Sequence, residues 1–167
     1  NDQLFGEGGN DTLYGGLADR EGHDHETDGD VISGGSGNDL LYGGFDVIAD
    51  MYGDDGNDTL HGGGALESFQ SGGDGDDVLY GEAETTFQYG GAGNDLIYGL
   101  GAETSIDGGS GNDSLYGGSA SWIFGRDGDD LLDGRLSHDY SSLFGGAGND
   151  IIYTGAASDA VEGGTGN

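Results

Sequence analysis

Aspartates recur at one place in a short glycine-rich pattern along this chain of 167 residues. In most copies a glycine is followed by Asn or Asp and then by the recurring Asp, and successive copies lie 9, 28, 19, 19, 18, 18, 17 and 20 residues apart. Hard cations such as Ca²⁺ prefer carboxylate and carbonyl oxygens, which such aspartates and glycines supply. The sequence therefore predicts cation binding. The candidate carboxylates are Asp2, Asp11, Asp39, Asp58, Asp77, Asp95, Asp113, Asp130 and Asp150.

The aspartate is the sixth residue of a nine-residue pattern, which is clearest in residues 34–42 and 90–98. The pattern reads Gly-Gly-x-Gly-x-Asp-x-U-x, where U is aliphatic. Glycines at positions 1, 2 and 4 permit a tight turn with positive φ and unobstructed carbonyls. A period near 18 residues is typical of a solenoid, and this nonapeptide is a known pattern of calcium-binding parallel β-helices.

Short strands must hold these turns in place. Position 8 is aliphatic in every copy, so the strand after each turn should send one side chain inward. These residues are Leu4, Leu13, Leu41, Leu60, Leu79, Ile97, Leu115, Leu132 and Ile152. The strand before the turn supplies a second inward column, namely Ile32, Met51, Ile106, Ile123, Leu143 and Val161. Gln70 and Gln88 interrupt this column, and we expect a one-residue shift there that points Phe69 and Phe87 inward.

The expected fold is all-β, a parallel β-roll or β-solenoid of about nine coils with about 18 residues per coil. Each coil has two short strands and two turns. The return turns at residues 62–65, 81–83, 99–102 and 117–120 are rich in glycine but lack the aspartate. The cation ladder is therefore predicted to lie mainly on one edge, and no long helix is expected.

The step from Asp11 to Asp39 breaks the phase, because 28 residues exceed one coil by nine or ten. Either an extra half-turn switches the cation edge, or residues 17–27 bulge out of the coil. We favour the bulge, because these residues supply no inward aliphatic side chain where one is needed. Residues 1–167 are predicted to be a single segment of the roll. It begins and ends within a repeat, which predicts that it is an excerpt of a longer array.

Charge and composition exclude several classes of partner and site. The formal net charge is −30, and the only basic residues apart from histidine are Arg20, Arg126 and Arg135. A phosphate backbone or an anionic membrane surface would be repelled, which excludes nucleic acid as a partner. The absence of cysteine excludes disulfides and thiolate metal sites. No apolar run approaches the roughly 20 residues that span a bilayer as a helix.

Stacked coils would bring neighbouring motif aspartates within about 5 Å of each other, close to the spacing of strands. Two such charges repel by ~1 kcal/mol in water and by ~3 kcal/mol at an intermediate dielectric constant. A divalent cation between them reverses the sign of the interaction. Folding and cation binding are therefore expected to be one event.

The nine copies of the motif, spread over essentially the whole chain, resemble the RTX (repeats-in-toxin) β-roll arrays of secreted Gram-negative toxins, proteases, lipases and adhesins. The resemblance implies calcium as the cofactor. It also implies flanking domains in the same chain, unfolded and calcium-free passage through a type I secretion system, and folding outside the cell.

The resemblance further implies a ligand set. Each ion would be held by the carbonyls of positions 1 and 3 and the Asp of one turn, and by the carbonyls of positions 2 and 4 and the Asp of the next turn. Gly34, Ser36 and Asp39 would then meet Asp54, Gly56 and Asp58, and Gly90, Ala92 and Asp95 would meet Gly109, Gly111 and Asp113. The remaining implied ligands are Gly53, Asp55, Gly72, Gly73, Asp74, Gly75, Asp77, Gly91, Gly93, Gly108, Ser110, Gly125, Arg126, Asp127, Gly128, Asp130, Gly145, Gly146, Ala147, Gly148, Asp150, Gly163, Gly164, Thr165 and Gly166.

The chain departs from the family pattern in two ways. The family commonly carries metal turns on both edges, whereas the return turns here lack Asp, so we expect about one calcium ion per coil. Position 2 is not glycine in three copies, where it is Glu7, Asp54 and Arg126. The terminal sites should be incomplete, because Asp2 is cut from its turn and Asn167 precedes no Asp.

Position 9 predicts an outward ladder of mostly aromatic side chains. Its members are Phe5, Tyr14, Tyr42, His61, Tyr80, Tyr98, Tyr116, Asp133 and Tyr153. We interpret the ladder as self-stacking that covers the strand surface. Glycan binding by stacking on the rings is the alternative.

Three further groups could do chemistry, and each has a simpler structural explanation. His23, Asp24, His25, Glu26 and Asp28 could bind a transition metal, but a solvated acidic loop is the favoured interpretation. His138, Asp139 and Ser141 are neighbours in sequence, which is not the geometry of a catalytic triad. Trp122, Ile123 and Phe124 could meet a partner, but burial is expected.

The sequence thus predicts a non-enzymatic calcium-binding module of a secreted multidomain bacterial protein, which folds on calcium outside the cell and acts as a structural spacer. An adhesin or an ice- or glycan-binding solenoid is one alternative, although position 3 lacks the threonine column that ice binding needs. The other alternative is the C-terminal part of a secreted enzyme or toxin whose active site lies elsewhere.

Overall fold

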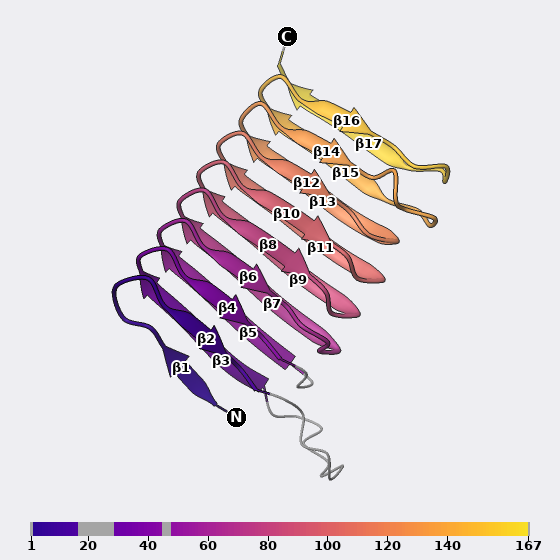
Figure 1. The fold of residues 1–167 in the computed structure, drawn as a ribbon. Coiled ribbons are helices and arrows are strands. Elements are labelled where there is room, and N and C mark those ends of the chain that lie inside the picture. The colour runs from indigo at the N-terminus through magenta and orange to yellow at the C-terminus, as the bar shows by residue number, and fades with distance from the viewer. Residues whose placement is uncertain (1, 17–28, 45–47, 167) are drawn as a thin grey trace.

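The computed structural model describes residues 2–16, 29–44 and 48–166. The chain winds into a rod of stacked coils, with its two ends at opposite ends of the rod (Figure 1). Each coil crosses one parallel sheet, turns, crosses a second parallel sheet and returns. The described residues contain no helix, and therefore none that could cross a bilayer.

The strands alternate between two sheets along the sequence. The first sheet has nine strands, β1 (Gln3–Phe5), β3 (Gly29–Ser36), β5 (Ile48–Asp55), β7 (Glu67–Asp74), β9 (Thr85–Ala92), β11 (Glu103–Ser110), β13 (Ala120–Asp127), β15 (Ser142–Ala147) and β17 (Ala160–Thr165). The second has eight shorter strands, β2 (Thr12–Tyr14), β4 (Leu40–Tyr42), β6 (Thr59–His61), β8 (Val78–Gly81), β10 (Leu96–Gly99), β12 (Ser114–Tyr116), β14 (Leu131–Asp133) and β16 (Ile151–Tyr153). The predicted all-β parallel solenoid is confirmed. Seven turns separate the motif aspartates from Asp11 to Asp150, so the expected nine coils is slightly too many.

The core consists of two facing columns of aliphatic side chains. The first sheet contributes Ile32, Met51, Ile106, Ile123 and Leu143, and the second contributes Leu41, Leu60, Leu79, Ile97, Leu115 and Leu132, all fully buried. Alternate residues of each long strand face this core, which is the period-two pattern of a strand. Val161 continues the first column beside Leu143 but is half exposed, because β17 is the last described strand of its sheet.

The glutamines lie inside the core, so the expected one-residue shift is wrong. The register runs without interruption through Met51, Gln70, Gln88 and Ile106, and Gln70 is fully buried. Gln88 Nε2 donates a 2.8 Å hydrogen bond to Gln70 Oε1, and Gln70 Nε2 donates one of 2.9 Å to the carbonyl of Tyr80. These bonds compensate Gln70 and the Gln88 Nε2 group for lost water, while Gln88 Oε1 is buried without a partner among the described residues. Phe69 and Phe87 stay outside.

The first copy of the motif lies on the other side of the rod from the position expected for it. β1 pairs with β3, so Leu4 is the neighbour of Ile32 in the first sheet and does not share a column with Leu13. Phe5 is likewise absent from the aromatic ladder. The physical reason is the spacing, since a step of 9 residues from Asp2 to Asp11 is half a coil and carries the chain from one sheet to the other.

The cation edge does not switch between Asp11 and Asp39. β2 pairs directly with β4, and the two aspartates are linked by a hydrogen bond, so the 28-residue step from Asp11 to Asp39 advances the chain by one coil. The predicted bulge at residues 17–27 lies outside the described residues.

Candidate metal centre

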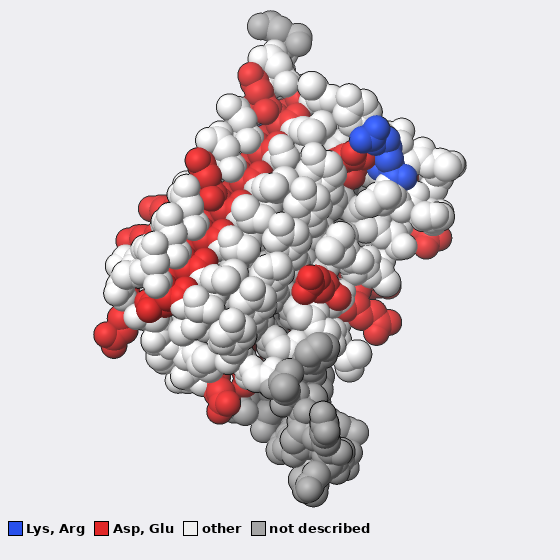
Figure 2. Space-filling model, in the orientation of Figure 1, with Lys and Arg blue, Asp and Glu red and all other residues white. Residues whose placement is uncertain are grey.

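The motif aspartates form a continuous ladder along one edge of the rod, where each coil passes from the first sheet to the second. The backbone N–H of each aspartate donates to Oδ1 of the aspartate one coil further along, with N···O distances of 2.7–3.1 Å. We call this the aspartate ladder, and it contains Asp11, Asp39, Asp58, Asp77, Asp95, Asp113, Asp130 and Asp150. Figure 2 shows acidic side chains in a nearly continuous band along one edge of the molecule.

The second carboxylate oxygen of every ladder aspartate is buried and lacks a hydrogen-bond partner within the described part of the chain. The aspartates themselves are deeply buried in the middle of the rod, and Asp58 and Asp77 each have 1 % of their surface exposed. A buried carboxylate oxygen without a donor costs folding free energy unless something positive meets it. Eight such atoms in a row form a set of buried anionic oxygens that a cation would suit.

Glycine at position 1 leaves the space into which these oxygens point. A methyl group added at Gly72 would collide with Asp77 Oδ2, and it would also meet the carbonyl oxygen of Gly90, which is position 1 of the next turn. The same arrangement recurs at Gly90, with Asp95 and the carbonyl of Gly108. The structure therefore brings together, in each turn, one carboxylate oxygen and one carbonyl oxygen from the next turn. This all-oxygen set suits calcium, which takes six to eight oxygen ligands.

Positions 2 and 4 have positive φ, as the glycine pattern predicts, in every turn from Gly35 and Gly37 to Gly146 and Gly148. Glu7, Asp54 and Arg126 adopt the same left-handed conformation at position 2, so a side chain there is strained but possible. Position 1 is different, because its φ is not in the left-handed region. Glycine is required at position 1 for space and not for backbone conformation.

Burial makes the aspartate charges unfavourable when no cation is present. Loss of solvation raises the pKa of Asp77 and Asp113 to about 7 and of Asp58 and Asp95 to about 6. The hydrogen bond from the backbone N–H of the aspartate one coil earlier lowers the pKa of Asp77 and Asp113. The charges of neighbouring carboxylates raise it. Burial also raises the pKa of Asp130. The ladder therefore carries negative charge at an energetic cost that a cation can remove.

A second ladder runs beside the first at position 5, and sequence reasoning missed it. Here the backbone N–H of each residue donates to Oδ1 of the residue one coil earlier, over 2.7–3.1 Å. This position-5 ladder contains Asn10, Asn38, Asn57, Asp76, Asn94, Asn112, Asp129 and Asn149. Its signal in the sequence was the restriction of position 5 to Asn or Asp, the side chains best suited to accept a bond from a nearby backbone.

The opposite edge is poor in carboxylates, as the return turns predict, but it is not devoid of them. The Asp2 N–H donates to Asp30 Oδ1, which reproduces the ladder geometry on this edge. Asp30 is 2 % exposed, and its Oδ2 has no partner among the described residues. Further along the same column the register places small residues, Ala49, Ser68, Thr86, Thr104 and Ser121. Sequence reasoning missed Asp30, although it precedes Ile32 by two residues just as Asp39 precedes Leu41.

No group of three or more His, Cys, Asp or Glu side chains is placed to hold a metal among the described residues. This agrees with a site of one carboxylate per turn that must be completed by backbone carbonyls. The proposed transition-metal residues His23, Asp24, His25, Glu26 and Asp28 all lie outside the described residues.

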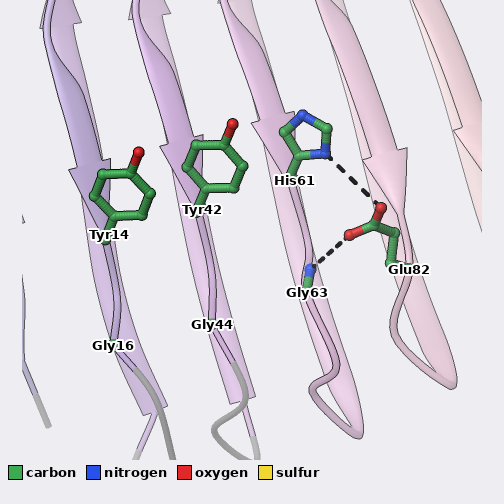
Figure 3. Close-up of a pocket in the computed structure, with 7 residues that line it drawn as sticks. All are labelled: Tyr14, Gly16, Tyr42, Gly44, His61, Gly63 and Glu82. Atoms are coloured by element: carbon green, nitrogen blue, oxygen red, sulfur yellow. Dashed lines mark hydrogen bonds and ion pairs between the residues drawn. The ribbon is translucent and has the colours of Figure 1, made fainter.

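The aromatic ladder is a stack of rings lying face to face. Tyr14, Tyr42, His61, Tyr80, Tyr98 and Tyr116 follow one another with centroids 4.7–5.4 Å apart and nearly parallel planes. A cavity of about 600 Å³ opens beside the first three rings, next to the glycines of the return turns and Glu82 (Figure 3). The internal ring faces of the stack are closed against one another, so the geometry favours the self-stacking interpretation over stacking with sugars.

The remaining candidates take structural roles. The His138 Nδ1 lies 2.9 Å from the Leu136 carbonyl, whereas the Ser141 hydroxyl is bonded to the Ser137 hydroxyl, so the two side chains do not form a nucleophile–base pair. Trp122 has 49 % of its surface exposed, so its expected burial is wrong, while Ile123 beside it lies in the core.

Comparison with known proteins agrees with this geometry. The family model for the RTX calcium-binding nonapeptide repeat (4 copies) matches residues 1–19, 26–46, 50–65, 71–84, 101–121, 119–140 and 142–167. Comparisons with curated proteins and with solved structures gave no match. The copy at residues 90–98 falls between matched segments, yet Asp95 continues the aspartate ladder on both sides. The matched segments cover most of the sequence, and the chain belongs to the RTX calcium-binding nonapeptide repeat family.

Proposed function

We propose that this β-solenoid folds when calcium enters the gaps between its coils, and that it then serves as a rigid spacer in a secreted multidomain protein. The observation that carries the proposal is the row of buried Oδ2 atoms without a partner in the described residues. Each such atom opposes folding until a cation meets it, so the fold and the ion should depend on each other.

Seven gaps between the eight ladder aspartates support about one calcium ion per coil on this edge. In the middle of the rod, Asp77 Oδ2 and the Gly90 carbonyl are the best-supported pair of ligands. The carbonyls of positions 2, 3 and 4 are the further ligands that the family resemblance implies. On the opposite edge, the column that begins with Asp2 and Asp30 has no further carboxylate until Asp159, which supports a one-edge count for the middle of the rod.

Calcium concentration would act as the signal for folding. RTX repeats are typical of secreted proteins, and extracellular calcium modules have dissociation constants of ~10⁻⁴ to 10⁻³ M. At ~10⁻⁴ M, calcium at ~1 mM adds about 1.4 kcal/mol of stability per site. The same chain would lose that contribution in calcium-poor cytosol, which suits export in the unfolded state.

Far-UV circular dichroism during a calcium titration tests the proposal. We expect a disordered spectrum in chelator, a cooperative change to a β spectrum as calcium rises to ~10 mM, and reversal when chelator is restored. Magnesium at the same concentration is the control, because its demand for near-ideal octahedral geometry suits this site poorly. A β spectrum that is already complete in chelator would contradict coupled folding.

A further inference from the structure

The outer face of the first sheet carries two large exposed rings on either side of a small residue. Phe87 on β9 and Trp122 on β13 have 51 % and 49 % of their surface exposed. Both are paired in register with Ser105 of the intervening strand β11. Because neighbouring strands lie about 4.8 Å apart, the two rings rise from backbones separated by about 10 Å. The result is a notch with aromatic walls over Ser105.

The size of the notch limits what it can hold. A cavity of about 50 Å³ is lined by these three residues together with Thr85 and Glu103. This volume suits a compact group and not a hexose ring with its hydroxyls. A trimethylammonium group, with one nitrogen and three methyl carbons, is a compact group whose methyls can rest between two rings.

The charge of the notch favours a cation. Glu103 precedes Ser105 by two residues on β11, so it lies on the same outer face, and it is exposed. Of the described arginines, Arg126 is bonded to Asp107 and Arg135 to Asp133, and the chain has no lysine. No described basic side chain is therefore available to neutralise Glu103. A cation midway between the walls would lie about 5 Å from each ring, within the ~6 Å range of cation–π attraction.

We propose that the notch formed by Phe87, Ser105, Trp122 and Glu103 binds the trimethylammonium group of a choline-like compound or lipid headgroup. The two rings meet the methyl groups, and the Glu103 carboxylate balances the charge. The net charge of −30 works in the same direction, because it attracts cations and repels anionic ligands.

Trp122 is the only tryptophan in the chain, so tryptophan emission, excited at wavelengths longer than the tyrosine absorption band, reports on this notch. We would titrate choline chloride into the calcium-loaded protein, with sodium chloride as the ionic-strength control. The neutral isostere 3,3-dimethyl-1-butanol is the chemical control, and we expect it to bind about tenfold more weakly because it lacks the cation–π contribution. Equal binding of the alcohol, or a larger response to a neutral oligosaccharide than to choline, would overturn the proposal.

Variants separate the notch from the rest of the sheet. Glu103→Gln should weaken choline binding about fivefold, and Phe87→Ala about tenfold or more. Glu67→Gln is the matched control, because Glu67 lies two strands away in the same register row and should leave binding unchanged. Circular dichroism in calcium confirms that each variant is folded. If folded Glu103→Gln and Phe87→Ala bind choline like the unaltered chain, the notch is not the site.

Sedimentation with phosphatidylcholine vesicles distinguishes the two sources of the group. Co-sedimentation that free choline competes away assigns the site to a lipid headgroup. Choline binding without co-sedimentation assigns it to a small soluble compound.

Discussion

At the scale of single residues, each ladder aspartate uses its two oxygens differently. Oδ1 accepts a hydrogen bond from the preceding coil, which joins the coils together. Oδ2 is buried without a partner among the described residues, which opposes the same stacking. One side chain therefore stabilises the fold or destabilises it, depending on whether a cation is present.

Replacement of Asp77 by Asn should have opposite effects in calcium and in chelator. Asn keeps an Oδ1 acceptor for the N–H of Asp58 but removes the charge. We expect the calcium midpoint for folding to rise severalfold, because the gaps on both sides lose an anionic ligand. In chelator we expect the variant to be more ordered than the unaltered chain, because a buried charge is gone.

The matched control is Asp76→Asn, one residue away. Position 5 is already Asn in most coils, and Asp76 accepts its bonds from Asn94 at the surface, so this change should leave the calcium midpoint nearly the same. Circular dichroism in calcium titrations and in chelator measures both variants. Loss of order by Asp77→Asn under both conditions would show that the charge of Asp77 is not what opposes folding.

Acidity should partly replace calcium. Burial raises the pKa of Asp77 and Asp113 to about 7, against an ordinary value of 3.8, so the folded chain binds more protons than the unfolded chain between these values. The raised pKa values therefore contribute stability to the calcium-free fold. This contribution is fully present below about pH 4 and is lost as the pH rises through 6 to 7. In chelator, we expect more β structure at pH 5 than at pH 8 by circular dichroism, and a calcium midpoint that rises as pH falls. The opposite trend in chelator would contradict burial as the cause.

At the scale of strands and turns, the sequence predicts the residues that repeat in every coil. It does not predict buried residues that depend on a hydrogen-bond partner in a neighbouring coil. The aliphatic residue at position 8, such as Leu60 or Leu79, needs only to be apolar and in phase, so its burial was predictable. The inward glutamines were not, because a buried amide is acceptable only when another amide or a carbonyl meets it, and that partner lies one coil away.

The candidate site was predictable to a similar degree. The aspartate of each turn was identified from its spacing. The placement of Asp2 on the opposite edge was missed, although the 9-residue step to Asp11 is half a coil and was its signal. The exposure of Trp122 was missed for a different reason. Three apolar residues in a row, Trp122 to Phe124, do not show which of them face the core until the register is known.

Replacing the core glutamines should reveal their dependence on each other. Gln88→Leu alone leaves Gln70 Oε1 buried without its donor and should cost about 1–3 kcal/mol. The double change Gln70→Leu and Gln88→Leu restores an aliphatic column, so its cost should be well below the sum of the two single changes. Urea unfolding in saturating calcium measures all three variants. Strictly additive costs would show that the two amides stabilise the core independently.

At the scale of the whole molecule, the rod has no centre that could fold first and organise the rest. Each coil touches only its neighbours, through the two sheets and through two hydrogen-bond ladders whose donors point in opposite directions along the rod. Such one-dimensional architectures gain stability coil by coil. A charge of −30 spread over this chain should therefore prevent any compact state until enough gaps hold calcium.

Small-angle scattering should show this as a large change of size. An unfolded chain of this length has a radius of gyration of about 43 Å, and a compact one about 15 Å. We expect the larger value or more in chelator and a value close to the smaller in calcium, with a short rod as the shape. A radius below about 25 Å in chelator would mean that the chain is already compact without ions.

The unequal spacing of the ladder aspartates has a mechanical consequence. If a single molecule is pulled by its ends until coils detach one at a time, each coil of 17–20 residues releases a contour length of about 60–70 Å. The step between Asp11 and Asp39 spans 28 residues and releases about 100 Å. The long extension marks the N-terminal end of the rod, so its place in the force trace, early or late, tells from which end the molecule unwinds.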